Sequence, residues 1–250
     1  MPLADRSIIV TGAARGLGRD YARFFAEEGA KVAVADIARE QGEETAAEIV
    51  SAGGTAIFVP LDVTSLESAE AMARTVADNF GRIDGLINNA ALWGDIVQSP
   101  LLEIDPDYWD TVMAVNLKGP LLCARAVAPY MKEQRFGRII NISSMGAYMP
   151  GGAYCVSKLA LHQVTWQLAA ELGSFGVTVN AVGPGPIYNE ATRKQLPDPG
   201  VFERLVQGTL TKRGGTSKDI YGMLRYLMSD EAEWVTAQPF MVNGGFLVNL

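Results

Sequence analysis

Cysteine and histidine are scarce in this sequence: its 250 residues include two cysteines, Cys123 and Cys155, and one histidine, His162. With so few thiol or imidazole ligands, we do not expect a metal site built from them. Both cysteines stand in apolar, helix-like surroundings, which favours a reduced, buried pair over a disulfide. This cysteine usage predicts a cytoplasmic protein without a metal.

Long apolar runs and clusters of positive charge are missing as well. No apolar stretch reaches the ~18 residues that a membrane span needs. The first residues lead directly into a strand-like segment, without the pattern of a secretory signal. The formal net charge is −7 and no run of Lys and Arg is present, which argues against a nucleic-acid-binding surface. We therefore expect a small-molecule partner, with neither membrane nor nucleic acid involved.

The balance of apolar and charged residues is that of an ordinary globular protein. Hydrophobic residues make up 48% of the 250 residues and charged residues 20%, enough to bury a core on both sides of a sheet. Strand-like and helix-like segments alternate throughout, without repeats, linkers or low-complexity stretches. This alternation predicts a single α/β domain over residues 1–250, with a doubly wound parallel sheet and helices on both faces.

A glycine-rich turn follows the first predicted strand, Ser7–Val10, and precedes a helical pattern. Its glycines allow a tight turn and a close approach of the backbone to a pyrophosphate, toward which the first N–H groups of the helix then point. The alternative is a turn that only lets the helix pack on the sheet. The predicted contacts to the cofactor are Gly12, Arg15, Gly16, Leu17 and Gly18.

An acid, Asp36, ends the second predicted strand, Lys31–Ala35. At this position a carboxylate accepts hydrogen bonds from the adenine ribose and repels a 2′-phosphate. Capping of the next helix is the alternative role, and the two roles are compatible. Arg15 favours a 2′-phosphate instead. We expect Asp36 to prevail and NAD to be the cofactor, because an acid desolvated against a phosphate costs more than a flexible surface arginine contributes.

Two further strand ends are expected to border the cofactor. Asp62 and Val63 follow the third predicted strand, where Asp62 lies near the adenine or simply caps a helix. The fourth strand is followed by Asn88-Asn89-Ala90-Ala91, whose amides can tie neighbouring strands together through backbone hydrogen bonds. The small residues after them leave room for a cofactor, so we expect Asn89 and Ala90 to contact it.

The candidate catalytic group is Tyr154 with Lys158, ten residues after Ser144. Residues four apart lie on one face of a helix, so the ammonium of Lys158 favours the phenolate of Tyr154. With the hydroxyl of Ser144, this group suits proton transfer to or from an alcohol or carbonyl oxygen. The more common interpretation of such a pair is a packed ring and a solvated charge. Tyr148 is a rival phenol, but it has no lysine one turn on.

Taken together, these stretches resemble the short-chain dehydrogenase/reductase family over almost the whole chain. The matching motifs are Thr11 to Gly18, Asn88-Asn89-Ala90-Ala91, Asn116, Ser144, Tyr154-x3-Lys158 and Pro184-Gly185. The resemblance implies a Rossmann-type fold with a sheet of about seven strands and nicotinamide-dependent alcohol/carbonyl chemistry.

The resemblance also assigns roles to the catalytic residues. It makes Tyr154 the acid/base and Ser144 the hydrogen-bond partner of the substrate oxygen. Lys158 is expected to lower the pKa of the phenol and to bind the nicotinamide ribose, and Asn116 to support a proton-relay water. It further implies a homotetramer.

Three features depart from the family pattern. Ala91 stands where family members usually have glycine. The separation of ten residues between Ser144 and Tyr154 is shorter than usual, although counting from the preceding strand still favours Ser144 over Ser143. Asn189 stands where a threonine commonly contacts the carboxamide. The cofactor contacts expected in this last segment are Pro184, Gly185, Ile187 and Asn189.

Residues 186–211 are rich in Pro and Thr and lack firm periodicity, which predicts a substrate lid within the domain. Apolar residues of this lid and of other loops suggest a pocket for a neutral substrate, cyclic or aromatic. The alternative is that these side chains only pack the lid. The expected pocket residues are Trp93, Met145, Tyr148, Met149, Pro186, Tyr188 and Phe202.

The helix predicted from Tyr154 to Ser174 is apolar on nearly every face, which indicates burial, here in a subunit interface. His162 and Trp166 on it are interpreted as core or interface residues. The leading hypothesis is an NAD(H)-dependent oxidoreductase that interconverts a secondary alcohol and a ketone. One alternative is an NADPH-dependent 3-oxoacyl-type reductase, and another is a nucleotide-binding regulator or scaffold.

Overall fold

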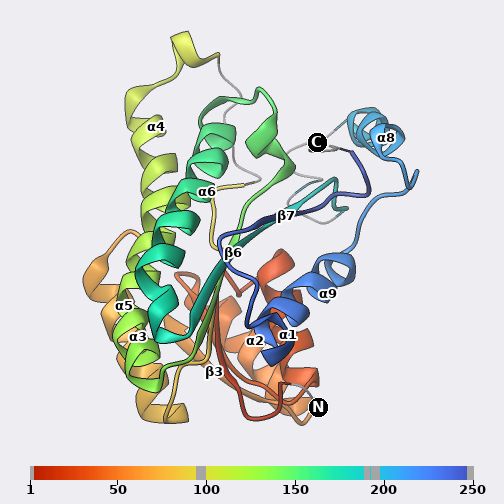
Figure 1. Ribbon diagram of the computed structural model, residues 1–250. Helices are drawn as coiled ribbons and strands as arrows, with labels where there is room; N and C mark the ends of the chain where they lie inside the picture. The colour runs from red at the N-terminus through yellow and green to blue at the C-terminus, as the bar shows by residue number, and fades with distance from the viewer. Residues whose placement is uncertain (1–2, 94–99, 189–191, 193–197, 247–250) are drawn as a thin grey trace.

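The computed structural model describes residues 3–93, 100–188, 192 and 198–246 (Figure 1). Its seven strands form one sheet in the order β3-β2-β1-β4-β5-β6-β7, and every pairing is parallel. The strand order reverses between β1 and β4, which opens a crevice at the carboxyl ends of these strands. The predicted Rossmann-type domain is confirmed. The strands are β1 (Ser7–Thr11), β2 (Lys31–Asp36), β3 (Thr55–Pro60), β4 (Gly85–Asn88), β5 (Gly137–Ile142), β6 (Val177–Pro184) and β7 (Pro239–Val242).

Helices cover both faces of the sheet (Figure 1). Side chains alternate across a strand, so Ile8 and Val10 of β1 join the core of one face and Ile9 joins the other. None of the helices in the described ranges is long and apolar enough to span a membrane. The first face carries α1 (Gly16–Glu27), α2 (Arg39–Ser51) and α9 (Ser217–Met228); the second carries α3 (Leu66–Phe80), α5 (Gly119–Gln134) and α6 (Gly152–Leu172).

The helical region over residues 106–134 is interrupted. It consists of α4 (Pro106–Met113), a π-helical turn (Ala114–Lys118) and α5. Asp105 caps α4 by accepting a hydrogen bond from the Asp107 backbone N–H. The π-helical turn contains Asn116, and such turns often occur at functional sites.

The segment after β6 contains a helix that the sequence pattern did not predict. This helix, α8 (Pro199–Gly208), falls within the stretch 186–211. Asp198 caps it by accepting a hydrogen bond from the Gly200 N–H, and Pro199 occupies its first turn. Both are typical helix-start signals. The role of residues 186–211 as a lid stays a prediction.

Candidate active site

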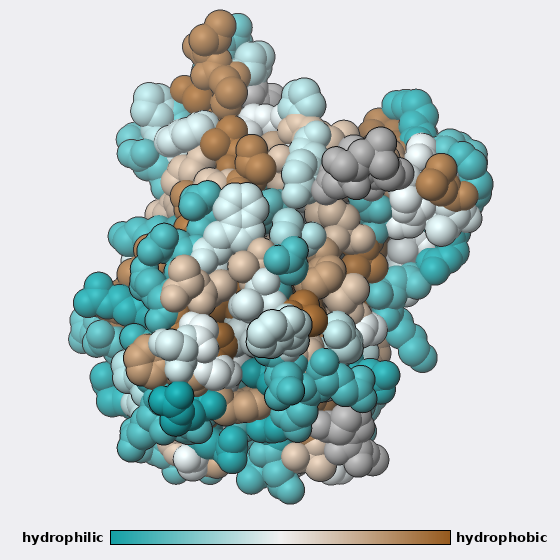
Figure 2. Space-filling model, viewed as in Figure 1, coloured by the Kyte–Doolittle hydropathy of each residue, from teal (hydrophilic) through white to brown (hydrophobic). Residues whose placement is uncertain are grey.

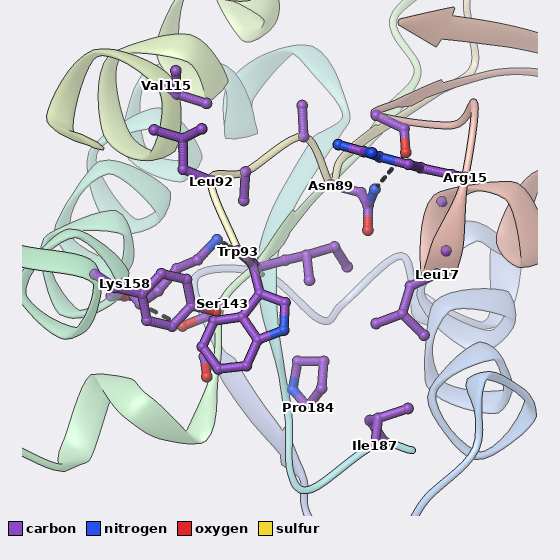
Figure 3. Close-up of a pocket in the computed structure, with 18 of the residues that line it drawn as sticks. Arg15, Leu17, Asn89, Leu92, Trp93, Val115, Ser143, Lys158, Pro184 and Ile187 are labelled. Carbon is purple, nitrogen blue, oxygen red and sulfur yellow. Dashed lines mark hydrogen bonds between the residues drawn. The ribbon is translucent and has the colours of Figure 1, made fainter. Parts of the chain in front are cut away.

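A cavity of about 500 Å³ opens at the carboxyl ends of the strands. Its lining combines the glycine turn after β1 with the segments that follow β2, β3, β4, β5 and β6. Side chains of α6 and α8 complete it. Figure 3 shows Arg15 and Leu17 at one side of this cavity and Ser143 and Lys158 at the other, with Trp93 between them. The cavity therefore has a cofactor end and a catalytic end.

The glycine turn leaves the start of α1 open. Arg15, at the N-cap position, makes no side-chain cap hydrogen bond, and the first turn contains no acid. Gly16 has φ +58°, and the position that a side chain would take there faces open space. Free N–H groups at a helix start bind phosphate. The residues at this end therefore fit the pyrophosphate of a dinucleotide.

Glycine is required in this turn for close packing as well. Gly12 has φ +65°, and a Cβ on it would lie 2.7 Å from Ala90 Cα. A Cβ on Gly18 would collide with the carbonyl oxygen of Gly12. The turn therefore packs directly against the segment after β4, which brings two parts of the cavity wall together.

Asp36 connects two loops at the cofactor end. Its carboxylate accepts hydrogen bonds from the backbone N–H groups of Ala14 and Ala38, both at 2.9 Å. The N-cap of α2 is Ala38 itself, so Asp36 supports the start of that helix from two residues before. Its carboxylate also lines the cavity, as does Arg15. Asp36, which favours NAD, and Arg15, which favours a 2′-phosphate, thus both lie at this end of the cavity.

The two adjacent amides at the end of β4, Asn88 and Asn89, tie strands together, as expected. Asn89 Nδ2 donates to the carbonyl oxygens of Thr11 and Gly12, at 2.9 and 3.1 Å. Asn88 Nδ2 donates to Asn141 Oδ1 at 2.8 Å, which links β4 to β5. These bonds fix the floor of the crevice. All predicted cofactor contacts line the cavity except Asn189, which lies outside the described residues: Gly12, Arg15, Gly16, Leu17, Gly18, Asp36, Asp62, Val63, Asn89, Ala90, Tyr154, Lys158, Pro184, Gly185 and Ile187.

Ser144, Tyr154 and Lys158 meet at the catalytic end. Ser144 and Tyr154 both line the cavity, and the hydroxyl of Ser144 lies close enough to the phenol to lower its pKa. Ser144 Oγ also accepts the Gly146 backbone N–H at 3.0 Å. Lys158 is buried, with Nζ 2.8 Å from the carbonyl oxygen of Ile142 and 5.6 Å from the centre of the Tyr154 ring. The neighbouring Ser143 turns its hydroxyl toward His162 instead, at 2.7 Å. Two hydroxyls and an amine thus converge where a substrate oxygen has room to bind.

The pKa values of Tyr154 and Lys158 differ from the expectation that the lysine lowers the pKa of the phenol. Burial raises the pKa of Tyr154 to about 12, and the nearby hydroxyl of Ser144 only partly opposes the rise. Burial also lowers the pKa of Lys158 to about 8. In the chain alone, desolvation of the phenolate is the main effect on the pKa of Tyr154, and the lowering of this pKa expected from Lys158 is absent.

Asn116 ties the catalytic helix to the loop after β4. Its Oδ1 accepts the Leu92 backbone N–H at 2.8 Å, and its Nδ2 donates to Ser157 Oγ at 3.3 Å. Asn116 is buried and does not line the cavity, whereas Val115 beside it does. Its side chain thus holds the segment that leads to Trp93. The role assigned to it with a relay water stays a prediction.

The substrate end is only partly as predicted. Trp93 lies against the catalytic phenol, with 4.9 Å between the centres of the Trp93 and Tyr154 rings. Met145, Pro186 and Phe202 also line the cavity, together with Thr192 and Leu205, which the sequence did not single out. Ala91 lines it as well, so the methyl group that replaces the usual hydrogen is accommodated.

Three predicted pocket residues do not line the cavity: Tyr148, Met149 and Tyr188. Tyr148 turns toward His162, with its hydroxyl 3.4 Å from Nδ1. Met149 follows the short 3₁₀ turn η3 (Met145–Tyr148), whose first residue alone among its members reaches the cavity. Tyr188 is 60% exposed and packs on the outer side of Phe202, with ring centres 5.1 Å apart.

Comparison with known proteins gives consistent matches. Residues 12–247 match the family described as Enoyl-(Acyl carrier protein) reductase. An uncharacterised oxidoreductase of Mycobacterium tuberculosis is 44% identical over 240 residues, 96% of each chain. The 3-oxoacyl-[acyl-carrier-protein] reductase FabG of Staphylococcus epidermidis is 36% identical, covering 96% of this chain and 98% of that one. A solved structure from Sinorhizobium meliloti 1021, designated a short-chain alcohol dehydrogenase, has a TM-score of 0.92 at 33% identity, covering 99% of this chain and 98% of the other.

Proposed function

The chain belongs to the short-chain dehydrogenase/reductase family, and on this basis we propose that it is an NAD(H)-dependent oxidoreductase that interconverts a secondary alcohol and a ketone. As a family member it is an oxidoreductase that uses a nicotinamide cofactor and acts on a small molecule. The observation that carries the proposal is the convergence of Ser144, Tyr154 and Lys158 in one cavity with the open start of α1.

The proposed chemistry divides between these residues. A bound nicotinamide supplies the hydride acceptor for oxidation or the hydride donor for reduction. The hydroxyls of Ser144 and Tyr154 hold the substrate oxygen between them. Tyr154 takes the proton of the alcohol during oxidation and returns it during reduction. Lys158, as the ammonium, favours the phenolate form that accepts this proton.

Asp36 supports NAD as the cofactor. Its carboxylate lies at the cavity wall, fixed by two backbone N–H groups, and a fixed anion there repels a 2′-phosphate. The second candidate is an NADPH-dependent 3-oxoacyl-type reductase. Arg15 in the cavity lining favours it, as does the similarity to FabG of S. epidermidis. The ratio of the two cofactors in turnover separates these candidates.

The lining of the substrate end supports a neutral, apolar substrate, cyclic or aromatic. Among the described lining residues, the charged side chains are Arg15, Asp36 and Asp62 at the cofactor end and the catalytic Lys158. The substrate end has Thr192 as its polar side chain beyond the serines, and the others are apolar or aromatic. The indole of Trp93 offers a flat surface beside the reacting oxygen, and flat rings stack favourably on such surfaces.

Exposed apolar side chains on α5 and α6 support a homo-oligomer, which we propose to be a tetramer. Leu159 is 52% exposed and Trp166 45%, with Leu121 on the neighbouring helix at 41%. Figure 2, seen from the side of α6, shows pale and brown surface between hydrophilic margins. Closed symmetric assemblies are the usual way to cover such a surface. Sedimentation as a stable monomer at micromolar concentration would contradict this.

A screen of secondary alcohols with NAD and with NADP tests the proposal. The panel contains cyclic, aromatic, linear and charged alcohols, and formation of the reduced nicotinamide is followed by absorbance. We expect oxidation of a cyclic or aromatic alcohol with NAD. Reduction of a 3-oxoacyl thioester by NADPH alone would favour the second candidate. Binding of NAD without turnover of any alcohol or ketone would indicate a regulator or scaffold.

A further inference from the structure

His162 is the single histidine of the chain, and the proposed reaction does not use it. It lies on α6, four residues beyond Lys158, and is 3% exposed. Its Nε2 is 2.7 Å from Ser143 Oγ, and its Nδ1 is 3.4 Å from the hydroxyl of Tyr148. Buried polar groups are kept by their hydrogen bonds, and here both ring nitrogens have a partner. The imidazole therefore joins three segments of the chain.

The hydrogens of this cluster can be assigned from its donors and acceptors. Burial and the nearby Lys158 lower the pKa of His162, so its ring is neutral and carries one N–H. Ser143 Oγ donates to the carbonyl oxygen of Lys158 at 3.2 Å, which leaves it to accept the hydrogen of Nε2. Nδ1 is then the acceptor for the hydroxyl of Tyr148. Every donor in the cluster has an acceptor.

The two partners of His162 flank the turn that carries the catalytic serine. Ser143 directly precedes Ser144, and Tyr148 is the last residue of η3. Met145, at the start of η3, lines the substrate end of the cavity. His162 itself does not line the cavity. It thus holds both ends of the turn against α6 from the side that faces away from the substrate.

We propose that His162 is a positioning residue: it clamps the turn 144–148 to α6 and thereby keeps the hydroxyl of Ser144 in hydrogen-bond reach of Tyr154. This inference rests on the proposed function, because the clamp matters to catalysis only if these two hydroxyls share the substrate oxygen. A displacement of a reacting group by about 1 Å can cost up to about a hundredfold in rate. His162 therefore acts through Ser144 and moves no proton itself.

Three variants separate positioning from mere packing. His162→Leu removes both hydrogen bonds, whereas His162→Gln keeps an amide near the position of Nε2 and so keeps the bond to Ser143. Thr165→Val is the matched control, because it removes a different buried hydrogen bond of α6, to Asn141 Nδ2 at 2.9 Å. We expect His162→Leu to lower kcat for alcohol oxidation about tenfold, with the KM for NAD unchanged. His162→Gln should recover most of kcat.

Thr165→Val should lower the Tm and leave kcat unchanged. Crystal structures of the wild type and the His162 variants give a readout that needs no turnover. The hydroxyl of Ser144 should take the same position beside Tyr154 in the wild type and in His162→Gln and be displaced from it in His162→Leu. If the protein oxidises no alcohol, the proposed function fails, while this geometric result still decides the role of His162.

The proposal is overturned if His162→Leu keeps both kcat and the position of the Ser144 hydroxyl, or if Thr165→Val lowers kcat as much. Ser143→Ala decides the question if His162→Leu does not fold. It deletes one hydroxyl without adding volume and breaks the bond to Nε2. We expect a severalfold loss of kcat and a displaced Ser144 in this variant, and an unchanged Ser144 with full kcat would overturn the proposal equally.

Discussion

The two ends of the cavity are built in different ways. The cofactor end consists of short continuous stretches at strand ends, in which backbone groups and small residues form most of the binding surface. The start of α1 is open there, and Asp36 is held by two backbone N–H groups. The substrate end is assembled from side chains that are far apart in the sequence, including Trp93, Met145, Thr192 and Phe202.

This difference teaches which kind of site a sequence can reveal. A stretch that must follow the shape of a phosphate is constrained residue by residue, so it forms a motif. A surface that only has to be apolar and of the right size can be built from many residues. If the two ends of the cavity also function independently, a substitution at one end should leave the function of the other end intact.

Tyr154→Phe should have the largest effect and should act on the chemistry alone. It keeps the ring against Trp93 and removes the proton carrier, so kcat should fall at least ~100-fold. The KM for NAD should change little. Steady-state kinetics with varied NAD check both. Tyr148→Phe is the matched control and should stay within a few-fold of the wild type, because Tyr148 does not line the cavity and the shorter bond from His162 to Ser143 still holds the turn. An inactive Tyr148→Phe together with an active Tyr154→Phe would show that Tyr148, and not Tyr154, is the acid/base.

Asp36→Ser should change the choice of cofactor and nothing at the substrate end. Repulsion of a 2′-phosphate predicts a preference for NAD of about a hundredfold in kcat/KM, and the variant should lose most of it. Asp78→Ser, on the exposed side of α3, changes the net charge equally and should keep the preference. A comparable kcat/KM of the wild type with NADP would contradict this prediction and would indicate that Arg15 determines the cofactor preference.

Trp93→Ala should have the smallest effect, confined to the substrate end. Loss of a flat apolar surface next to the reacting oxygen should lower kcat/KM for a cyclic or aromatic alcohol about tenfold, or ~1.4 kcal/mol. The preference for NAD should not move. Trp234→Ala removes an indole that is 95% exposed and absent from the cavity lining, and it should behave as the wild type. An equal loss in both variants would show that the indole of Trp93 does not select the substrate.

The fold could be predicted from the sequence because each signal was local. Apolar runs ending in small residues marked the strands, and their alternation with helical patterns required a parallel sheet. The helix α8 was missed because its surroundings are rich in Pro and Thr. Its start does have a sequence signal, because Asp198 followed by Pro199 is a typical N-cap with proline in the first turn. The π-helical turn around Asn116 left no signal in the sequence.

Several properties of the site could not be predicted from the sequence because they depend on the three-dimensional geometry. Tyr148 and Met149 were expected in the pocket as apolar or aromatic residues of a loop, but the direction of their side chains depends on the 3₁₀ turn that follows Ser144. The pKa of Tyr154 depends on how deeply the folded chain buries the phenol, which spacing along a helix cannot show. The bonds of His162 to Ser143 and Tyr148 likewise arise only when β5, η3 and α6 meet.

The pH dependence of kcat for alcohol oxidation tests the central claim most directly, namely that Tyr154 is the base and Lys158 sets the pH at which it works. In oxidation the phenolate accepts the proton, so kcat should rise with pH through an apparent pKa of the Tyr154–Lys158 pair. Because the cofactor complex adds positive charge, this value should lie below the value of about 12 that burial gives the phenol in the chain alone. In Lys158→Met the rise should move to higher pH. A rise at the same pH in Lys158→Met, or one that persists in Tyr154→Phe, would contradict the account.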